Sequence, residues 1–593
     1  MISIALFNEA GNFRKLFDND PEARWCFIGK DVVKRGRITK ILGLQKRFYL
    51  KGMLYEVAEE LRQPYLDFVA GLGKQQKEQL NWWASKFASK CNFQTDFFLL
   101  LCYKVMTLKL IQEAENEVNI VIFIEDPWLF ADLKDKNKEV RFLGYSNLFF
   151  KKLFYFIRGI IYRFLLVGWF VAAKSLMRFY HNGKKPKILE GRSPAVCILN
   201  PAEKRAFKDG EYVDNYMPGL AELYEKNDIP YFRLYLLPFA FSTAKYVGQN
   251  RELLWPLIND AKFSNLMKRI FEYWNPVLND NGENNVNGYE VTLLLKREKC
   301  FEFSRVGFNL QLVLFDALDN FFRKKWCCSV IYLFENQPWE KMLCMSAIKN
   351  NAKAIGYQHS SIWRLFLSQF MGEDESSIMP LPHKIITSSS YFADLYRESG
   401  VPKDKIVIGG TWRYSHLLTG TKGDFLKQGN SLKTIILVSL PIDISISESM
   451  LDSIFKVASK ITEPEKIDFW IKPHPGVPLS KLVILNRLPP GCLMVNKPFN
   501  ELLNNIDIVI TSASASGLEA HLHGKEVISY IPENLIAADA LFDIKNANIY
   551  KWFEGEDLNT DFLLTPSSTN AEDSKEKFFD EINYEVWLKF VDV

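Results

Sequence analysis

Short apolar runs that end in polar loops recur in the second half of the chain. Ile467–Ile471 is followed by Lys-Pro-His-Pro-Gly, and Ile506–Ile510 is followed by Thr-Ser-Ala-Ser-Ala-Ser-Gly and then by a helical pattern from Leu518. Such runs predict buried strands, and their regular alternation with helical segments from residue 383 to 530 is typical of a parallel sheet with flanking helices. We therefore predict a C-terminal α/β domain whose strands present polar loops at their carboxyl ends, where such sheets bind ligands.

A similar alternation of strands and helices precedes this domain. Apolar runs at Ala195–Leu199, Tyr231–Leu237 and Ser329–Phe334 alternate with helical patterns, and Val118–Ile124 reads as another buried strand. Two α/β units in tandem, each with polar residues at strand ends, predict two Rossmann-like domains that face each other across a cleft. The predicted division is 1–146 for an N-terminal α/β region, 147–185 for an inserted aromatic and basic helical segment, 186–380 for the continuation of the N-terminal domain with the acceptor and catalytic residues, 381–560 for the C-terminal nucleotide-binding domain and 561–593 for a tail or closing helix.

The segment Asn147–Tyr180 is rich in aromatic and basic residues. Its longest uncharged stretch, Phe164–Ala173, is shorter than the ~20 residues that span a bilayer, and lysines and arginines interrupt the segment throughout. This pattern predicts an amphipathic helix that lies in a membrane interface. The alternative is a buried helical hairpin whose cations extend to the surface.

Composition narrows the possible classes of function. The 593 residues carry a formal net charge of +4, which gives no case for nucleic-acid binding. The nine cysteines are scattered without a Cys-x-x-Cys pair, so neither a disulfide scaffold nor a structural zinc site is predicted. The N-terminus lacks the basic and long apolar regions of a signal peptide. We expect a cytoplasmic protein that is peripheral on the inner face of the cytoplasmic membrane.

The two C-terminal loops predict an anion site. In the second loop small hydroxyl residues lie between a strand and a helix N-terminus, where backbone N–H groups and the helix dipole favour a phosphate. Lys472 and His474 add a charge and a donor from the first loop, although His474 has an alternative as a helix cap. Glu519, one turn into the helix, either accepts ribose hydroxyls or is a solvated first-turn acid. The hydroxyl residues predicted to bind the nucleotide are Thr511, Ser512, Ser514 and Ser516.

Candidate catalytic residues follow strands in the first α/β unit. Glu335 ends the run Ser329–Phe334 and is expected to project into the cleft as nucleophile or base. Glu340 lies in the first turn of the next helix, where a favourable dipole interaction is a sufficient alternative. His359, at another strand end, is expected to protonate a leaving group or to contact acceptor or phosphate. Further cleft candidates are Glu125 and Asp126, which follow an apolar strand or form a turn, and Asp214 in a loop. No Asp-x-Asp motif stands at a strand end, so we expect no metal and no other cofactor.

The C-terminal loops resemble motifs of bacterial transferases that use CMP-activated sugar acids. In bacterial sialyltransferases and in the Kdo transferases of capsule and lipopolysaccharide assembly, a His-Pro motif and a Ser/Thr-rich motif bind the nucleotide. Lys472, His474 and Pro475 match the first motif, and the serines of the second loop match the second. These enzymes have the GT-B architecture of two facing Rossmann-like domains.

A second resemblance, taken with the two C-terminal loops, covers most of residues 80–530. The tetrapeptide Tyr-Gln-His-Ser at 357–360 resembles the Gln-His-Gly element of Kdo and polyol-phosphate transferases, with Ser360 in place of Gly, and adds Gln358 to the acceptor or cleft candidates. A family of surface-carbohydrate biosynthesis proteins has motifs similar to four segments of this chain, in the same order: Trp82-Trp83-Ala-Ser-Lys, Tyr212-Val-Asp-Asn-Tyr216, Glu335-Asn-Gln-Pro-Trp-Glu340 and Gly356-Tyr-Gln-His359.

The resemblance implies a glycosyltransferase of bacterial surface-polysaccharide assembly. Its donor would be a CMP-activated sugar, Kdo-like or another nonulosonic acid, and its acceptor a lipid-linked or oligosaccharide glycan at the inner-membrane surface. One alternative is a CDP-glycerol-type polyol-phosphate transferase or a nucleotide-sugar 2-epimerase, which use related His and Ser loops. A second alternative is a non-catalytic scaffold of the polysaccharide machinery.

Overall fold

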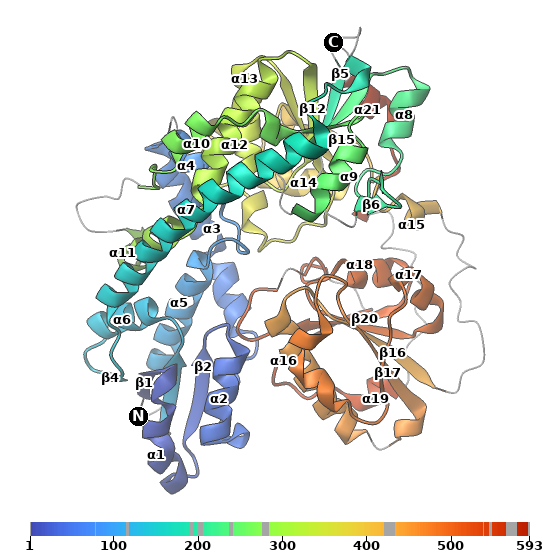
Figure 1. Cartoon of the computed structure of the whole chain (residues 1–593). Coiled ribbons are helices and arrows are strands. Elements are labelled where there is room, and N and C mark those ends of the chain that lie inside the picture. Colours follow the sequence, from blue (N-terminus) through green and yellow to red (C-terminus); the bar gives the residue numbers. More distant parts are fainter. Residues whose placement is uncertain are drawn as a thin grey trace.

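The structure is a computed structural model. It describes residues 2–76, 79–113, 118–189, 195–199, 206–236, 241–275, 284–419, 433–461, 463–537, 539–544, 548–564 and 578–590. Three parallel sheets organise these residues (Figure 1).

The C-terminal domain is built on a six-stranded parallel sheet. Its strands lie in the order β18-β17-β16-β19-β20-β21, which is the 3-2-1-4-5-6 order of the Rossmann fold. Alternate residues of β16 pack into different apolar clusters, Leu437 into one and Ile436 and Val438 into the other, so both faces of the sheet are buried. The strands are β16 Thr434–Ser439, β17 Ile467–Lys472, β18 Cys492–Met494, β19 Ile508–Thr511, β20 Glu526–Ile531 and β21 Ile549–Phe553, and the main helices are α16 Ile444–Lys460 and α18 Ala515–Leu522.

The middle domain repeats this plan with seven parallel strands in the order β15-β14-β13-β12-β5-β8-β9. Counted along the chain this is again 3-2-1-4-5-6 with one more strand at the edge, so the prediction of two Rossmann-like domains is confirmed. The strands are β5 Ala195–Leu199, β8 Tyr231–Tyr235, β9 Leu254–Pro256, β12 Cys327–Leu333, β13 Lys353–Gln358, β14 Lys384–Thr387 and β15 Ile406–Ile408, and the main helices are α11 Thr292–Phe303, α12 Gly307–Phe322, α13 Pro338–Lys349 and α14 Ser390–Glu398.

The predicted domain boundary at residue 381 does not coincide with a boundary between sheets. Strands β14 and β15 follow that residue, yet they pair with β13 in the middle domain. The chain later returns to this domain, because α21 (Tyr584–Lys589) packs Trp587 against Tyr357 and Trp412. A closing helix was expected within 561–593; residues 565–577 and 591–593 of that range lie outside the described residues.

The first 143 residues form a sheet of their own, which corrects the prediction that they share a domain with 186–380. Its four parallel strands lie in the order β2-β3-β1-β4, and none pairs with a described strand of the middle domain. We call residues 2–143 the N-terminal unit. Its strands are β1 Ile2–Leu6, β2 Arg24–Ile28, β3 Ile120–Ile124 and β4 Arg141–Leu143, and its main helices are α2 Val32–Leu42, α3 Met53–Lys74, α5 Phe97–Glu113 and α6 Pro127–Lys136.

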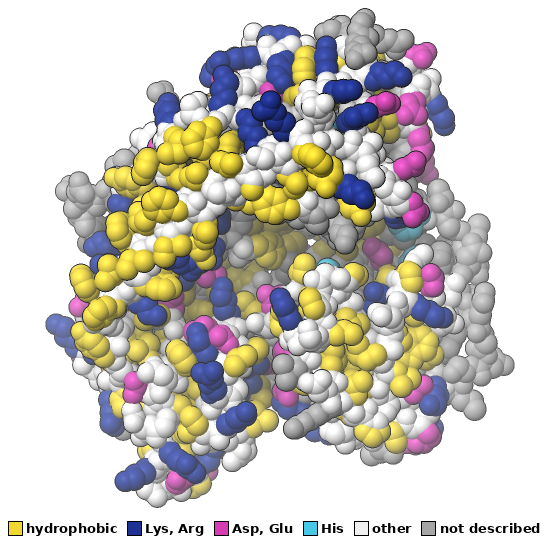
Figure 2. Space-filling view, viewed as in Figure 1, with side chains coloured by type: hydrophobic (Ala, Val, Ile, Leu, Met, Phe, Trp, Pro, Cys, Tyr) yellow, Lys and Arg dark blue, Asp and Glu magenta, His cyan; other side chains and the backbone are white. Residues whose placement is uncertain are grey.

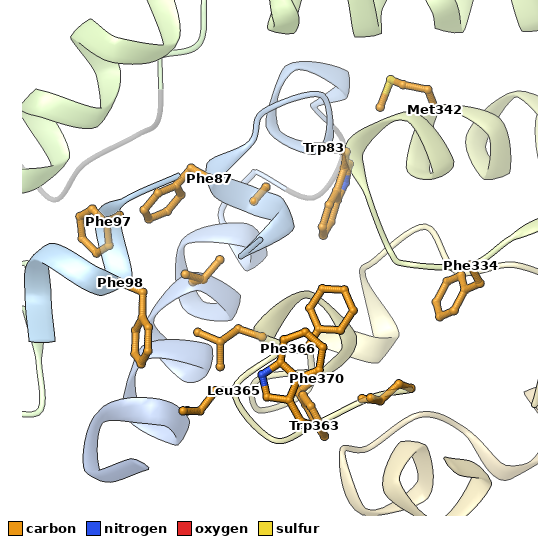
Figure 3. Packing of buried hydrophobic residues seen from close by; sticks show 14 of the residues in the cluster. Trp83, Phe87, Phe97, Phe98, Phe334, Met342, Trp363, Leu365, Phe366 and Phe370 are labelled. Carbon is orange, nitrogen blue, oxygen red and sulfur yellow. The ribbon is translucent and has the colours of Figure 1, made fainter. Parts of the chain in front are cut away.

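The N-terminal unit packs against both Rossmann-like domains. Toward the middle domain the contact is largely apolar, and the rings of Trp83, Phe87 and Phe97 share one buried cluster with Phe334 and Trp363 (Figure 3). Toward the C-terminal domain the contact includes buried ion pairs, because Arg47 pairs with Glu533 and Glu554, and Arg35 lies 3.0 Å from Glu554. In the same contact Tyr55 stacks on Phe542. The unit therefore connects the two domains on one side of the molecule.

A single 34-residue helix, α7 (Leu148–His181), joins the N-terminal unit to the middle domain. It runs along the surface and packs mainly against α9 (Ala244–Gln249) and α11 (Figure 1). The segment predicted to be amphipathic is therefore one continuous helix and not a hairpin, because no turn residue interrupts its hydrogen bonding.

Candidate functional site

Three polar residues line up where neighbouring strands of the C-terminal sheet end. In the registers of the sheet Ser439 of β16 lies beside Lys472 of β17 on one side and beside Thr511 of β19 on the other. The strand order reverses between β16 and β19, and the crevice at such a reversal is where doubly wound sheets bind ligands. The row Lys472–Ser439–Thr511 therefore borders the expected ligand crevice. Ser439 was missed in the sequence; its place as the last residue of an apolar run was the available signal.

The serine-rich loop continues this row. Ser514 caps the N-terminus of α18, and its hydroxyl lies 2.8 Å from that of Ser516, which donates to Ser439 Oγ at 2.8 Å. Ala513 has a φ of +51°, a conformation that turns the chain sharply ahead of the helix. The hydroxyl of Ser512 is buried without a hydrogen-bond partner among the described residues. The loop thus offers several hydroxyl donors at a helix N-terminus.

A glycine sets the distance between this helix and the sheet. A Cβ at Gly517 would lie 2.6 Å from Thr511 Cγ2 and 2.8 Å from Leu541 Cδ1. Only glycine permits this approach, which places the first turn of α18 directly over the end of β19.

The Lys-Pro-His-Pro loop follows β17, which lies on the other side of β16 from the strand that leads into the serine-rich loop. Burial lowers the pKa of Lys472. His474 Nδ1 accepts a hydrogen bond from the Gly476 N–H at 3.0 Å, so the neutral ring carries its proton on Nε2. The imidazole thus shapes the turn, while Pro475 is exposed. The same turn brings Gly476 near Ile442 of the loop that follows β16.

The middle domain contributes Glu335 and His359, which follow the neighbouring strands β12 and β13. His359 Nε2 lies 3.7 Å from Glu335 Oε1, and the rings of His359 and Tyr216 pack nearly perpendicular to each other with centroids 5.1 Å apart. Burial, and then the charge of Arg413, lower the pKa of His359 to about 3. Burial raises the pKa of Glu335, against the opposing effect of Arg413. His359 is therefore neutral at pH 7 and has no imidazolium proton to give, in contrast to the proton donor that its sequence context suggested.

Arg413 connects the two domains electrostatically. It follows β15 of the middle domain, and its charge opposes the raised pKa of both Glu335 and Glu519, the latter on α18 of the C-terminal domain. One guanidinium thus acts on carboxylates from both sides. Sequence reasoning missed Arg413, although it lies five residues after a predicted strand end. Figure 2 shows the molecule hollowed between these two domains, with acidic and histidine side chains at the rim.

Glu340 is a helix cap and not the catalytic carboxylate expected from the sequence. It is 2% exposed, and its oxygens accept the backbone N–H groups of Glu335, Asn336 and Gln337 at the start of α13. Burial raises its pKa well above the usual range. The sequence alternative, a first-turn acid, describes this residue.

Two further cleft candidates have structural partners. Gln358 Oε1 accepts the N–H and the hydroxyl of Ser388 at 2.9 Å each and so ties β13 to β14. Asp214 pairs with Arg233 at 2.8 Å and accepts the N–H groups of Tyr216 and Met217. Asp214 therefore orders the loop that carries Tyr216, which touches His359.

The structure places Glu125 and Asp126 in a separate cavity of about 450 Å³ at the carboxyl ends of the N-terminal sheet. Glu125 accepts the backbone N–H groups of Lys30 and Asp31 and pairs with Lys34. Asp126 caps α6 and pairs with Arg297. These carboxylates are engaged in local contacts, and they are not grouped with Glu335. Among the described residues no three metal-ligating side chains cluster.

No protein-family model matches the chain, and no curated protein matches it in sequence. Among solved structures, UDP-GlcNAc 2-epimerase from Methanocaldococcus jannaschii aligns with 67% of this chain and 99% of its own, at 10% identity and a TM-score of 0.36. A putative UDP-N-acetylglucosamine 2-epimerase from Listeria monocytogenes aligns over 57% and 79%, at 8% identity and a TM-score of 0.32. A calicheamicin glycosyltransferase aligns over 57% and 80%, at 10% identity and a TM-score of 0.33. The assignment of two Rossmann-like domains follows from the strand orders of the sheets.

Proposed function

We propose that the protein is an enzyme acting on a nucleotide-activated sugar, with the nucleotide in the C-terminal domain and the sugar directed at Glu335 and His359. The observation that carries this proposal is the position of Arg413, whose charge acts on carboxylates of both domains. A ligand that spans a phosphate site on one side and a carboxylate–imidazole pair on the other fits this arrangement.

The proposed nucleotide site is supported by the linked hydroxyl groups of Ser439, Ser514 and Ser516. Ser514, Ser516 and the N-terminus of α18 would bind phosphate oxygens, and Lys472 would supply a positive charge from the adjacent strand. Glu519, one turn further along α18, is positioned for ribose hydroxyls. A single lysine in the row matches one phosphodiester, which favours the finer proposal of a CMP-linked sugar acid, Kdo-like or nonulosonic.

The proposed chemistry is supported by the carboxylate of Glu335. A carboxylate with a raised pKa is a stronger base, and it would deprotonate an acceptor hydroxyl as the glycosidic bond to the nucleotide breaks. The neutral His359 would orient Glu335 or the acceptor by a hydrogen bond. Arg413 would stabilise negative charge that develops on the departing phosphate. Transfer to a lipid-linked or oligosaccharide glycan is the reaction we propose.

A nucleotide-sugar 2-epimerase is the second candidate. It is favoured by Glu335, because a carboxylate with a raised pKa can take a proton from a sugar carbon and, as the resulting carboxylic acid, return one to the other face after the intermediate has turned. The two reactions differ in an observable product. In deuterated water an epimerase incorporates deuterium at the sugar carbon, whereas a transferase releases the nucleotide only when an acceptor is present.

Binding is the first test. Thermal shift and titration calorimetry with CMP, CDP, UDP and their sugar conjugates should find a ligand that stabilises the protein, by about 2.7 kcal/mol at a hundredfold excess over its Kd. Ser516→Ala should weaken that ligand by about tenfold, as expected for one lost hydrogen bond to a charged group. The control, Ser459→Ala, removes an exposed serine hydroxyl of α16 that donates to Lys456 O. Absence of binding by every nucleotide would exclude the proposal and leave the scaffold alternative.

A further inference from the structure

The outward face of α7 is largely apolar from Phe149 to Val171. By length and composition α7 is the one helix among the described residues that could cross a membrane. Figure 2 shows its hydrophobic side chains gathered in a broad band along this face of the molecule. The exposed large hydrophobic residues of the helix are Phe149, Phe150, Leu153, Phe154, Phe156, Ile157, Ile160, Ile161, Tyr162, Phe164, Leu165, Val171, Phe179 and Tyr180. A patch of this size on a soluble protein marks an interaction surface.

The inward face fixes the helix to the body. Arg163 donates to the carbonyls of Gly159, Ile270 and Phe303 at 2.9 Å each, and a Cβ at Gly159 would lie 2.6 Å from the Phe303 carbonyl. At the other end the ring of His181 bonds Leu254 O at 2.9 Å. A transbilayer position would break these buried bonds and would take the Arg163 charge into hydrocarbon. The packing therefore supports a helix that stays on the body with one face outward.

The charges on the helix select the partner. Residues 148–181 contain no Asp or Glu, while Lys151, Lys152 and Arg178 are exposed and Arg158 and Lys174 are half-buried. In a symmetric dimer formed through this face, the lysines and arginines of one copy would face those of the other copy. The helix has no carboxylate that could pair with them. An anionic lipid surface offers both hydrocarbon and negative charge.

A neighbouring helix extends the same surface. Ile270 directly follows α10 (Phe263–Arg269), and its carbonyl accepts a hydrogen bond from Arg163 of α7. The next residue, Phe271, therefore lies close to α7. Phe271 is 75% exposed, and Tyr273 and Phe263 are about half exposed. The 34 residues of α7 extend over about 50 Å at 1.5 Å per residue, long enough to hold the protein in one orientation.

We propose that α7, with Phe271 beside it, docks the protein on an anionic bilayer, lying in the plane of the interface with its aromatic rings among the acyl chains and its lysines and arginines at the headgroups. Aromatic and basic residues on one outward face are the composition of interfacial helices. This surface is separate from the nucleotide crevice, so the proposal does not depend on the proposed function.

Vesicle flotation of the full chain tests the proposal. With phosphatidylcholine vesicles that contain about 30% phosphatidylglycerol we expect most of the protein in the floated fraction, and roughly tenfold less with phosphatidylcholine alone or at high salt, where the charge attraction is screened. The triple variant Phe149→Ser, Phe164→Ser, Phe179→Ser should lose at least about tenfold in the partition coefficient. The matched control Ile442→Ser, Leu493→Ser, Tyr550→Ser removes exposed apolar residues from the C-terminal domain and should float as the parent does.

The charge component is tested by Lys152→Glu with Arg178→Glu, which should abolish the preference for anionic vesicles. Light scattering and circular dichroism verify that each variant is folded. Failure of the parent chain to float, or a parent dimer that the triple variant converts to monomer, would overturn the proposal.

Discussion

Both carboxylate oxygens of Glu340 accept the backbone N–H of Glu335, at 3.0 and 3.1 Å. One buried acid thus holds the chain segment that carries the other acid to the cleft. Asn336, between them, has a φ of +58°, and Ser368 donates to the Glu335 carbonyl at 3.0 Å. The backbone on both sides of Glu335 is therefore fixed before any ligand arrives, as positioning of a reactive group requires.

Removal of the cap should cost stability. Glu340→Ala leaves three buried N–H groups without an acceptor, and we expect the free energy of unfolding to fall by about 1–3 kcal/mol. Urea unfolding followed by fluorescence measures this loss. Glu501→Ala, at an exposed acid in the first turn of the short helix Phe499–Leu502, is the control and should change little. A stable Glu340→Ala protein would contradict the capping role.

Replacement of Glu335, the proposed base, should remove turnover and spare binding. Glu335→Gln keeps the shape of the side chain, and we expect kcat to fall by at least about a hundredfold while the nucleotide Kd changes by less than about twofold. The control is Glu373→Gln, at an exposed glutamate. Full activity in the Glu335→Gln variant would exclude this residue as base or nucleophile.

Arg413 should set the acid limb of the pH profile. A base acts when deprotonated, so kcat/KM should fall as the pH drops through the raised pKa of Glu335. Arg413 holds that pKa down, and Arg413→Gln should therefore move the limb to higher pH, whereas Arg413→Lys should leave it nearly in place. A limb unmoved by loss of the charge would separate Arg413 from Glu335.

His359 should make the protein sensitive to mild acid. Its pKa is lowered from 6.5 in the unfolded chain to about 3 in the folded protein, so the stability it contributes is complete above pH 6.5 and is lost as the pH falls toward 3. Between pH 6.5 and about 5 this loss amounts to about 2 kcal/mol. His359→Asn should flatten the fall, measured by urea midpoints at several pH values. His474→Asn, at a half-exposed histidine, is the comparison.

The buried ion pairs between the N-terminal unit and the C-terminal domain should be costly to break singly. Arg47→Met leaves Glu533 charged and buried, and we expect a loss of about 3–5 kcal/mol in the free energy of unfolding. The double change Arg47→Met with Glu533→Leu should recover part of it. Arg24→Met breaks an exposed pair with Glu22 and should cost less than about 1 kcal/mol.

Local patterns predicted the strands well, because a short apolar run of four to eight residues bounded by turn-forming polar residues favours a buried strand. Ile467–Lys472 and Ile508–Thr511 form where the runs predicted them, with polar residues at the carboxyl end. Partnership between strands is not local. The placement of β14 in the middle sheet depends on its register with β13, and the runs on either side of residue 381 look alike.

Site residues follow the same division. The serine loop was found because its residues are contiguous, and the structure joins Ser514 and Ser516 to Ser439, 75 residues earlier than Ser514. The sequence does not distinguish the roles of Glu335 and Glu340. Their burial does, because Glu340 is buried as a helix cap while Glu335 is partly exposed at the cleft. Arg413 acts on Glu519 from another domain, a relationship that the spacing in the chain does not contain.

The N-terminal unit gives the cleft a set width. Two Rossmann-like domains joined only by a linker can move apart and close again. Here the N-terminal unit packs against the middle domain through an apolar core and against the C-terminal domain through buried ion pairs. Movement of the C-terminal domain away from the N-terminal unit would have to break the ion pairs of Arg35 and Arg47 with Glu533 and Glu554. Any ligand that binds in the hollow between the two domains therefore meets walls whose spacing the N-terminal unit sets.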